Sequence, residues 1–465
     1  MVKLKKMNYR SVLILGLGRS GKEVGLLLKE KGKDVTIAET KNIPLIFRKK
    51  RQLEKLGIKV SIGPFHQNLL KGKDLVIISP GIDPALPLVK KTKLLGIPVL
   101  SELEIASRFL PREKIIAVTG TNGKTTTCFL TYKILRENGI KVKLAGNIGV
   151  PLSRLARVCH PASFDFVITE ISSFQLETTG TFSPHVYAIL NISPDHLDRH
   201  LSFDEYRKVK CLPLLRMKRD DVAFLNYDES WVKSVRGLTK ARVIFFSKTQ
   251  KLEKGLYREK GQIIARLEEG NFQISLDGLR LQNFHNWENV LCAVGIAILQ
   301  KIDIKSIHQV LRSYQPLPHR QEIVGEVKGV KFINDSKATN PGSVENLLES
   351  VEKPVILIMG GKDKGGDFSF LLKNKNLNKI KSVLTIGETG RKIKLTLARF
   401  VRVVECGSLE EAVKAAFSLS QEGDTVVLCP GCSSFDQFRS YRQRGAIFKR
   451  EVKKLLSYVT EKKLL

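Results

Sequence analysis

The stretch Ile115-Ile-Ala-Val-Thr-Gly-Thr-Asn-Gly-Lys-Thr-Thr126 is the strongest structural signal in the chain. Its first five residues form an apolar run that predicts a buried strand, and the run from Cys128 to Asn138 predicts a helix. A glycine turn between a strand and a helix directs backbone N–H groups and the positive end of the helix dipole toward an anion. The stretch therefore predicts a phosphate-binding loop in an α/β domain.

The side chains of this loop indicate which phosphate compound it binds. Lys124 can neutralise β- and γ-phosphate oxygens, and Thr125 can ligate Mg²⁺. Val118 stands where the common G-x4-G-K-[ST] pattern has its first glycine, so the spacing is not the usual one. We interpret the loop as an ATP site made of Gly120, Thr121, Asn122, Gly123, Lys124, Thr125 and Thr126. The alternative is a capped turn that only happens to contain a lysine.

Two other predicted strands end in polar residues. Glu170 follows the apolar run 166–169, and the polar segment Asn191 to His200 follows the run 186–190. The carboxyl ends of parallel strands form the ligand crevice of an α/β sheet, and carboxylate oxygens suit Mg²⁺. Glu170 is therefore a candidate ligand of one Mg²⁺, and His196 of a second cation.

The rest of the chain alternates strand-like and helix-like stretches, which is typical of parallel sheets covered by helices. Its 465 residues suggest about three domains. We expect a Rossmann-like domain over residues 1–111, a P-loop-type ATP-binding α/β domain over 112–314, and a Rossmann-like α/β domain over 315–465. The predicted strands are 12–15, 35–38, 75–78, 115–119, 166–169, 186–190, 331–334, 355–359, 382–386 and 425–429, with helices at 21–31, 128–138 and 287–299 and a strand-rich region over 222–281.

A second glycine loop lies near the N-terminus. Gly16-Leu-Gly-Arg-Ser-Gly21 is a G-x-G-x-x-G, and Glu39 ends the next predicted strand about 20 residues on. By pattern alone this arrangement predicts a dinucleotide cofactor with Glu39 on a ribose, as in an NAD-dependent oxidoreductase. The same loop also suits the diphosphate of another nucleotide-linked substrate, so both interpretations stay open.

The composition narrows the class of protein. The chain has a formal net charge of +32, which favours nucleic acid or small polyanions as partners, but its cations are spread along the sequence. We therefore expect a lysine-rich surface and no nucleic-acid partner, with a nucleic-acid-binding ATPase as the alternative. Seven scattered cysteines suit a reducing cytoplasm, and no apolar run approaches the ~18 residues of a membrane helix.

In combination, these motifs resemble those of the Mur ligase family over essentially the whole chain. The resemblance rests on Gly120 to Thr126, Glu170-Ile-Ser-Ser173, Asn191 to His196, His285-Asn-Trp-Glu-Asn289 and Asn334-Asp-Ser-Lys-Ala-Thr-Asn340. The segments Ser172-Ser-Phe-Gln-Leu176, Pro430-Gly-Cys-Ser-Ser-Phe-Asp-Gln-Phe438 and Gln443-Arg-Gly445 resemble the branch that adds D-glutamate. The Asp-Asn-Pro-Arg signature of the diamino-acid branch is absent, and Asn122 stands where the alanine-adding branch typically has His.

The resemblance implies the reaction and the ligands. It implies an ATP-dependent, ADP-forming ligase of peptidoglycan synthesis that adds D-glutamate to UDP-N-acetylmuramoyl-L-alanine through an acyl phosphate. ATP, two Mg²⁺ ions and the two small-molecule substrates would be its ligands, and we expect a cytoplasmic monomer without membrane insertion. A related ligase that adds another amino acid is the alternative within the family.

The resemblance also implies a role for individual residues. It places Asn286, Asn289, Arg320 and Asp335 at ATP, beside the loop residues. It places the UDP-linked substrate at Gly18, Arg19, Ser20, Glu39, Thr40, Ser79, Pro80, Gly81, Asn147 and Ser172. It places D-glutamate at Lys337, Thr339, Lys364, Ser434 and Tyr441, and the metals at Thr125, Glu170, His196 and Lys210.

Lys124, His196 and Lys210 are the predicted catalytic residues. Lys210, in Tyr206-Arg-Lys-Val-Lys210, resembles the position of a carbamylated lysine in this family. A carbamate would turn the lysine cation into an oxygen anion for the second metal. On sequence alone, a lysine in such a stretch is commonly a solvated charge on a helix face.

Overall fold

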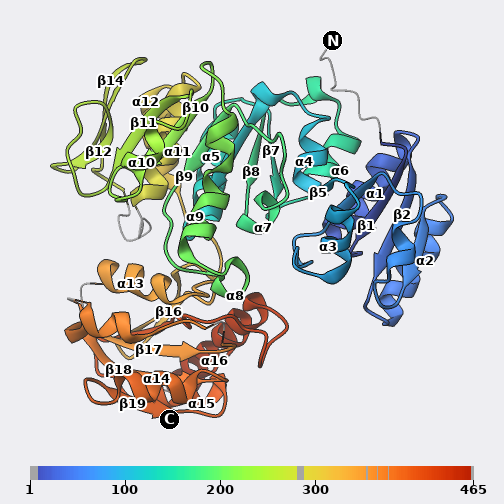
Figure 1. The fold of residues 1–465 in the computed structure, drawn as a ribbon. Coiled ribbons are helices and arrows are strands. Elements are labelled where there is room, and N and C mark those ends of the chain that lie inside the picture. The colour runs from blue at the N-terminus through green and yellow to red at the C-terminus, as the bar shows by residue number, and fades with distance from the viewer. Residues whose placement is uncertain (1–8, 280–286, 352–353, 364, 375, 462–465) are drawn as a thin grey trace. The chain divides into compact units, whose positions relative to one another are not determined.

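The computed structural model describes residues 9–279, 287–351, 354–363, 365–374 and 376–461. Its chain divides into two units (Figure 1). The first contains residues 1–192, 204–277 and 288–312, and the second contains 193–203, 278–287 and 313–465. Among the described residues, the first unit has two sheets and the second has one, and each sheet lies inside one of the three predicted domains. The predicted domain boundaries themselves stay a prediction.

The first sheet is parallel throughout and has the order β3-β2-β1-β4-β5. Clusters of apolar side chains cover both of its faces, with Val12 and Ile14 in one and Leu13 and Leu15 in the other. Its elements are β1 (Ser11–Leu15), α1 (Arg19–Glu30), β2 (Asp34–Glu39), α2 (Pro44–Glu54), β3 (Lys59–Ile62), β4 (Leu75–Ile78), α3 (Pro87–Leu94), β5 (Val99–Ser101) and α4 (Glu102–Ser107).

The second sheet has nine strands in the order β14-β13-β12-β11-β10-β9-β6-β8-β7, and only the β12–β13–β14 hairpins are antiparallel. Its strands are β6 (Ile115–Thr119), β7 (Val142–Gly146), β8 (Phe166–Glu170), β9 (Val186–Ile189), β10 (Val222–Asn226), β11 (Arg242–Ser247), β12 (Gly255–Glu259), β13 (Gln262–Leu267) and β14 (Gly270–Ser275). The accompanying helices are α5 (Lys124–Glu137), α6 (Leu152–Val158), α7 (Ser173–Leu176), α9 (Phe203–Cys211), α10 (Val232–Arg236), α11 (Trp287–Leu299) and α12 (Ile304–Ser313).

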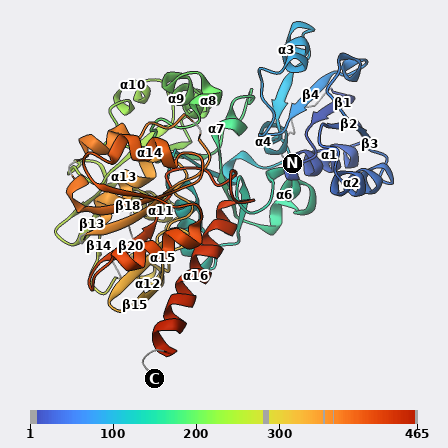
Figure 2. The ribbon, with the colours of Figure 1, turned by 90° about the horizontal axis from the view of Figure 1, so that it is seen from below.

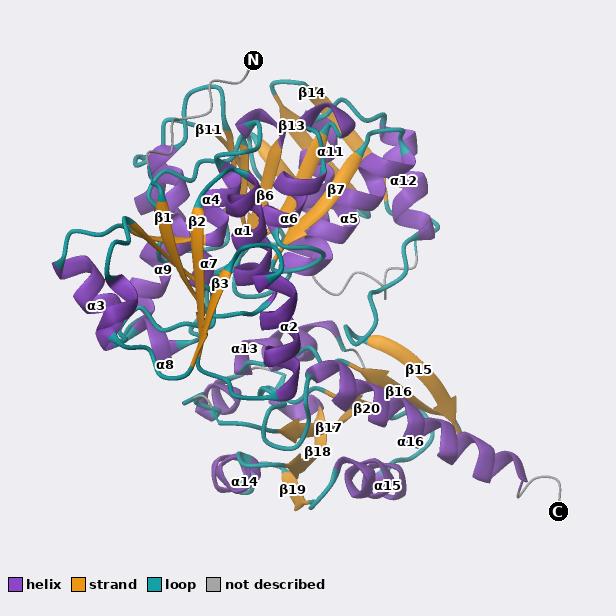
Figure 3. Cartoon of the chain, turned by 90° about the vertical axis from the view of Figure 1, so that its right-hand side faces the viewer, coloured by secondary structure: helices purple, strands orange, loops and turns teal. Residues whose placement is uncertain are grey.

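The sheet of the second unit has the order β15-β16-β20-β17-β18-β19, with β15 antiparallel to its neighbour. Successive residues of β17 point to opposite faces, so Leu357 and Ile358 belong to different apolar clusters. Helices lie around these strands, and α16 continues past the sheet (Figures 2 and 3). The elements are α8 (Leu197–His200), β15 (Glu322–Val327), β16 (Val330–Asn334), α13 (Pro341–Ser350), β17 (Val355–Gly360), β18 (Ile380–Ile386), α14 (Gly390–Leu397), β19 (Arg402–Glu405), α15 (Leu409–Leu419), β20 (Thr425–Leu428) and α16 (Tyr441–Glu461).

The predicted α/β class is confirmed, and the strands that the sequence missed share one cause. Strands 75–78 and 115–119 and helix 287–299 are confirmed at both ends. The strands that were missed, β3, β5, β7, β15 and β19, all lie at an edge of their sheet. Edge strands have one unpaired side and are often short or polar, so they lack a clear apolar run. Helix α5 begins at Lys124, earlier than the predicted Cys128, because Gly123 ends the loop in the left-handed conformation.

The close approach of α1 to β1 gives a test of the first sheet. A Cβ on Gly21 would lie 1.9 Å from the Gly16 carbonyl oxygen, whereas a Cβ on Gly18 would meet nothing within 4 Å. We expect Gly21→Ala to destabilise this sheet by about 1–3 kcal/mol because the helix must move away. Gly18→Ala is the matched control and should stay within ~0.5 kcal/mol of the wild type.

The stability of the first sheet in both variants is measured by unfolding in urea, with limited proteolysis of that sheet as the readout. Equal stability of Gly21→Ala and the wild type would show that α1 does not need this approach.

Candidate active site

The phosphate-binding loop closes on itself. Gly120 and Gly123 have φ angles of 154° and 83°, which side-chain-bearing residues rarely adopt. The Lys124 ammonium donates to the carbonyl oxygens of Gly120 and Thr121, each at 2.7 Å. The cation therefore lies over the mouth of the loop, where an anion at the N-terminus of α5 would meet it.

Residues from two distant segments hold the loop in place. Asn191, at the end of β9, accepts the Asn122 N–H through its side chain at 2.8 Å and the Thr121 N–H through its carbonyl at 2.9 Å. The Asn191 amide in turn donates to Glu288 at 2.9 Å. Asn289 lies so close to Gly123 that an added Cβ would be 2.0 Å from its Oδ1. The family motifs in the sequence had included Asn191, Glu288 and Asn289, and the resemblance had placed Asn289 at ATP, but neither had indicated that these residues support the loop.

Thr125, Glu170 and Asn147 meet at the carboxyl ends of β6, β8 and β7. The Thr125 hydroxyl donates to Glu170 Oε2 at 2.6 Å, and the Asn147 amide donates to Glu170 Oε1 at 2.7 Å. Glu170 is only 2% exposed. A hydroxyl and a carboxylate oxygen beside a phosphate loop are the hard oxygen donors that Mg²⁺ takes, so these residues fit the metal that the sequence implied.

Another acidic cluster does not fit a metal as well. His185, Asp220 and Asp221 gather their ligand atoms within 4.8 Å of one another. The Arg112 guanidinium contacts Asp221 and lies 2.9 Å from Asp220, so both carboxylates already form ion pairs with an arginine. None of the predicted metal ligands belongs to this cluster.

Lys210 is buried, which corrects the solvated-lysine interpretation of its stretch. Its side chain in α9 is 1% exposed. The ammonium donates to the Gly120 carbonyl at 2.9 Å and to the Thr119 hydroxyl at 3.3 Å, and it lies 4.8 Å from the centre of the Tyr206 ring. Lys210 therefore reaches the phosphate-binding loop, and it does so from a helix about 90 residues later in the chain.

His196 belongs to the second unit, whereas Thr125, Glu170 and Lys210 belong to the first. Its φ is 56°, and its Nε2 lies 3.6 Å from Asp195 Oδ2. Asp195 Oδ2 accepts from the Asn340 amide at 3.1 Å. A second metal centre shared by His196 and Lys210 stays a prediction.

The N-terminal glycine loop is shaped by two predicted substrate residues. Glu39 accepts the Leu17 N–H at 2.8 Å and the Lys41 N–H at 3.0 Å, and Ser79 donates to the Gly16 carbonyl at 3.1 Å. The Lys49 ammonium, which the sequence did not single out, donates to the Leu17 carbonyl at 3.2 Å. The open space at Gly18 leaves room for a ligand at the N-terminus of α1.

The other predicted substrate residues also lie in the first unit, most of them at the carboxyl edge of its first sheet. Ser20 is in the first turn of α1, and Thr40, Pro80 and Gly81 follow β2 and β4. Arg19 donates to the Gly149 carbonyl. Ser172 caps α7, because its hydroxyl accepts the Gln175 N–H.

The predicted D-glutamate residues are partly brought together. The Lys337 ammonium lies 4.4 Å from the centre of the Tyr441 ring. Thr339 lines a cavity of about 330 Å³ together with His196, Lys362 and Asp363, whereas Ser434 is 2% exposed and does not line it. Lys364, like the predicted adenine contact Asn286, lies outside the described residues.

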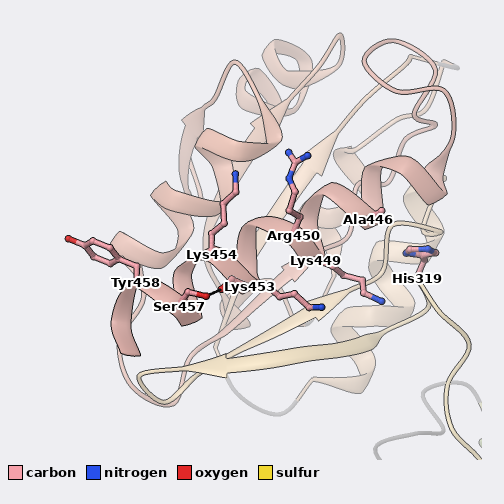
Figure 4. Close-up of a pocket in the computed structure, with 8 residues that line it drawn as sticks. All are labelled: His319, Ala446, Lys449, Arg450, Lys453, Lys454, Ser457 and Tyr458. Atoms are coloured by element: carbon pink, nitrogen blue, oxygen red, sulfur yellow. Dashed lines mark hydrogen bonds between the residues drawn. The ribbon is translucent and has the colours of Figure 1, made fainter. Parts of the chain in front are cut away.

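A larger cavity, of about 760 Å³, lies beside α16 and is lined by His319 and the basic residues of that helix (Figure 4). Lys449 pairs with Glu322 at 2.5 Å, and Arg450 and Lys454 both pair with Glu451 at 2.9 Å. Because these cations already have acidic partners and the groove is open to solvent, it is a weaker candidate for anion binding than the phosphate-binding loop.

Comparison with known proteins finds similarity to Mur ligases along nearly the whole chain. Three family models match: Mur ligase MurD-like N-terminal domain over residues 10–101, Mur ligase middle domain over 118–297, and Mur ligase, glutamate ligase domain over 319–432. The UDP-N-acetylmuramoylalanine–D-glutamate ligase of Thermoanaerobacter pseudethanolicus is 38% identical over 452 residues, which cover 96% of this chain and 98% of the relative. Its counterpart in Pelotomaculum thermopropionicum is 39% identical over 452 residues, with the same coverage.

Solved structures show the same fold at lower identity. The pseudomurein peptide ligase type C from Methanothermus fervidus is 20% identical and has a TM-score of 0.58, covering 96% of this chain and 100% of that one. MurF from Acinetobacter baumannii is 15% identical with a TM-score of 0.61, covering 92% and 98%. These similarities concern the fold alone.

The buried carboxyl of Asp335 predicts a pH dependence of stability. Burial raises its pKa to about 7, although Arg320 and the Gln321 N–H act in the opposite direction. Between about pH 4 and 7 the folded state therefore holds a proton that the unfolded state has lost, so stability falls as the pH rises through this window, by at most about 4 kcal/mol. The side chain of Asp335→Asn cannot ionise. The melting temperature of this variant, relative to that of the wild type, should therefore rise from pH 5 to pH 8.

Calorimetry of the second unit's transition at several pH values measures this difference. Glu326→Gln, which removes an exposed carboxylate from β15 of the same unit, is the matched control. A constant difference between Asp335→Asn and the wild type from pH 5 to 8 would contradict the raised pKa.

Proposed function

The chain belongs to the Mur ligase family, and from this premise we propose that it is an ATP-dependent ligase that joins D-glutamate to UDP-N-acetylmuramoyl-L-alanine in peptidoglycan precursor synthesis. The observation that carries the proposal is the group of relatives of that name, 37% to 39% identical over 95% to 96% of this chain. The convergence of Thr125, Glu170 and Asn147 beside the phosphate-binding loop supports it.

The reaction has two stages. A carboxylate is a poor electrophile, so an oxygen of the alanine carboxylate first bonds to the γ-phosphorus of ATP, and the bond to ADP breaks. The amine of D-glutamate then attacks the acyl carbon of the acyl phosphate, with release of inorganic phosphate and a proton. The protein contributes mainly by positioning the reactants and by offsetting the negative charge that develops.

The residues of the first unit have separate tasks in this scheme. The loop N–H groups and Lys124 hold the phosphates, and Thr125 with Glu170 would hold a Mg²⁺ ion, which would neutralise charge on the phosphate oxygens. Gly18 and its neighbours receive the diphosphate of the UDP-linked substrate at the start of α1, while Asn147 contacts the same substrate. Asn289, with Asn286, lies by the adenine.

The second unit completes the site in the proposal. Arg320 and Asp335 reach ATP, and the cations Lys337 and Lys364 pair with the carboxylates of D-glutamate, aided by Thr339, Ser434 and Tyr441. Because ATP contacts then come from both units, the proposal includes closure during turnover, with a hinge at residues 316–319.

The remaining parts of the proposal concern the state of the protein. No helix in the described part of the chain combines the length and the apolar character needed to cross a membrane. We propose a monomer that works in the cytoplasm on small molecules and does not bind nucleic acid. The oxidoreductase alternative would leave the second glycine loop and Glu170 without a task.

Amino-acid selectivity tests the proposed substrate. In the proposed site, buried polar groups pair with the side-chain carboxylate of D-glutamate, and they lose this partner when D-alanine binds. We therefore expect kcat/KM for D-alanine to be at least about 10³-fold lower than for D-glutamate. Lys337→Ala should raise KM for D-glutamate about 10-fold or more with little change in KM for ATP. Lys331→Ala, an exposed lysine on β16, is the matched control.

Phosphate release with the UDP-linked substrate and a panel of D- and L-amino acids is the measurement. Equal kcat/KM for D-alanine and D-glutamate would refute the assignment. Reduction of NAD without ATP turnover would instead support the oxidoreductase.

We also propose that Lys210 is carbamylated in the working enzyme. The uncharged amine adds to CO₂, forms a C–N bond and loses a proton, and the product is an anion with two oxygens. The Lys210 ammonium lies beside Gly120 of the phosphate-binding loop. A second Mg²⁺ near the γ-phosphate would take the carbamate oxygens as ligands there, directly or through water.

Lys210→Ala should abolish most of kcat and leave nucleotide binding nearly unchanged. Acetate or another short carboxylate should partly restore the rate, because it can occupy the place of the carbamate. Lys208→Ala is the matched control, since Lys208 is exposed on the same helix and pairs with Glu205. Full activity of Lys210→Ala without added carboxylate would show that no carbamate is needed.

A further inference from the structure

Arg444 is a completely buried cation in the second turn of α16. Its exposed fraction is 0%, and it is the largest side chain among the fully buried ones. The sequence had shown it only as part of Gln443-Arg-Gly445. A leucine or methionine could fill the same space without the cost of removing a charge from water, so a buried guanidinium calls for a specific explanation.

The guanidinium joins three loops of the C-terminal sheet. Nε donates to the Ser336 hydroxyl at 3.0 Å, and Nη2 donates to the carbonyls of Ser336 at 2.9 Å and Cys432 at 3.0 Å. Nη1 makes longer contacts with the carbonyls of Ser433 at 3.3 Å and Gly360 at 3.5 Å. Ser336 follows β16, Gly360 ends β17, and Cys432 and Ser433 follow β20.

None of these hydrogen-bond acceptors is a carboxylate. Burial lowers the pKa of Arg444 to about 10, although Cys432 and Asp436 act in the opposite direction, and the group still stays cationic at neutral pH. Five N–H donors in a rigid plane are what allows one side chain to reach three loops, and neither lysine nor a neutral residue offers this.

The surroundings of the guanidinium are closely packed. A Cβ on Gly361 would lie 2.2 Å from the Ser433 carbonyl and 3.1 Å from Nη1 of Arg444. One residue beyond Arg444, a Cβ on Gly445 would lie 2.3 Å from the His319 ring. Because there is little free space, a shift of Arg444 would displace the loops that it contacts.

The same loops carry the proposed amino-acid contacts. Lys337 follows Ser336, Ser434 follows Ser433, and Tyr441 opens the helix that contains Arg444. The Ser336 hydroxyl also donates to the Tyr441 carbonyl at 2.8 Å, which ties the first turn of α16 to the β16 loop. Arg444 thus holds Lys337, Ser434 and Tyr441 in register with one another without touching a ligand itself.

We propose that Arg444 is a positioning residue that sets the geometry of the amino-acid site through these three loops. The proposal rests on the proposed function for the place of the amino-acid site and for the identity of the amino acid. It requires that Arg444 affects the amino-acid substrate more than ATP or the UDP-linked substrate, whichever amino acid the wild type uses.

The first test compares Arg444→Met and Arg444→Lys with the wild type. Displacing binding groups by about 1 Å can cost on the order of 10²-fold, so we expect KM for the amino acid to rise about 10- to 100-fold. KM for ATP and for the UDP-linked substrate should change less than about 3-fold, because most of their proposed contacts lie in the first unit and only Asp335 stands on a loop that Arg444 holds. Arg444→Lys should lose nearly as much as Arg444→Met, since it keeps the charge but not the planar set of donors.

Two further variants complete the test. Arg450→Met removes an exposed arginine from the same helix and should leave all three KM values unchanged. Ser336→Ala removes one acceptor of Arg444 with minimal change of volume, and it should raise KM for the amino acid several-fold even if Arg444→Met fails to fold.

The outcomes separate the possible failures. Equal rises in all three KM values, or wild-type KM values in both Ser336→Ala and the Arg444 variants that fold, would overturn the positioning role. A wild type that prefers another amino acid over D-glutamate would overturn the proposed substrate, and the comparison among the three KM values would still decide the role of Arg444.

Discussion

The position of β6 between β8 and β9 is the constraint on which the ATP side of the site depends. Parallel neighbours bring their carboxyl ends to the same edge of the sheet, so the loop after β6 has Glu170 on one side and Asn191 on the other. Glu170 receives the Thr125 hydroxyl, and Asn191 receives two N–H groups of the loop. A different strand order would leave the loop without either partner.

The other two sheets repeat this arrangement with different chemistry. In the first sheet β1 lies between β2 and β4, and its glycine loop is held by Glu39 and Ser79 from the ends of those neighbours. In the third sheet β20 lies between β16 and β17, and Arg444 connects the ends of all three. Binding groups at the carboxyl edge of a sheet thus depend on a middle strand and its two neighbours.

Several buried charges of the protein are stabilised mainly by backbone and hydroxyl groups. Glu39 accepts from two backbone N–H groups, Lys210 donates to a carbonyl and a hydroxyl, and Arg444 donates to carbonyls and a hydroxyl. Polar partners of this kind satisfy the hydrogen-bonding capacity of a buried charge and leave its net charge in place. Such charges can therefore both fix a loop and act on a charged ligand near it.

The sequence by itself determined the central strands, both glycine loops and the polar residues that end the strands, because these depend on local apolar periodicity and on the φ angles that only glycine adopts readily. It also indicated the family, through motifs that keep the same order along the chain. Only the tertiary structure decided that Asn147 meets Glu170, that Lys210 is buried against Gly120, and that Arg444 joins three loops. Those contacts bridge 23 to 108 residues of sequence, and the order of strands in a sheet, which creates them, follows from long-range packing that no local pattern records. The edge strands were missed for the related reason that their stability comes from one neighbouring strand and less from an apolar run of their own.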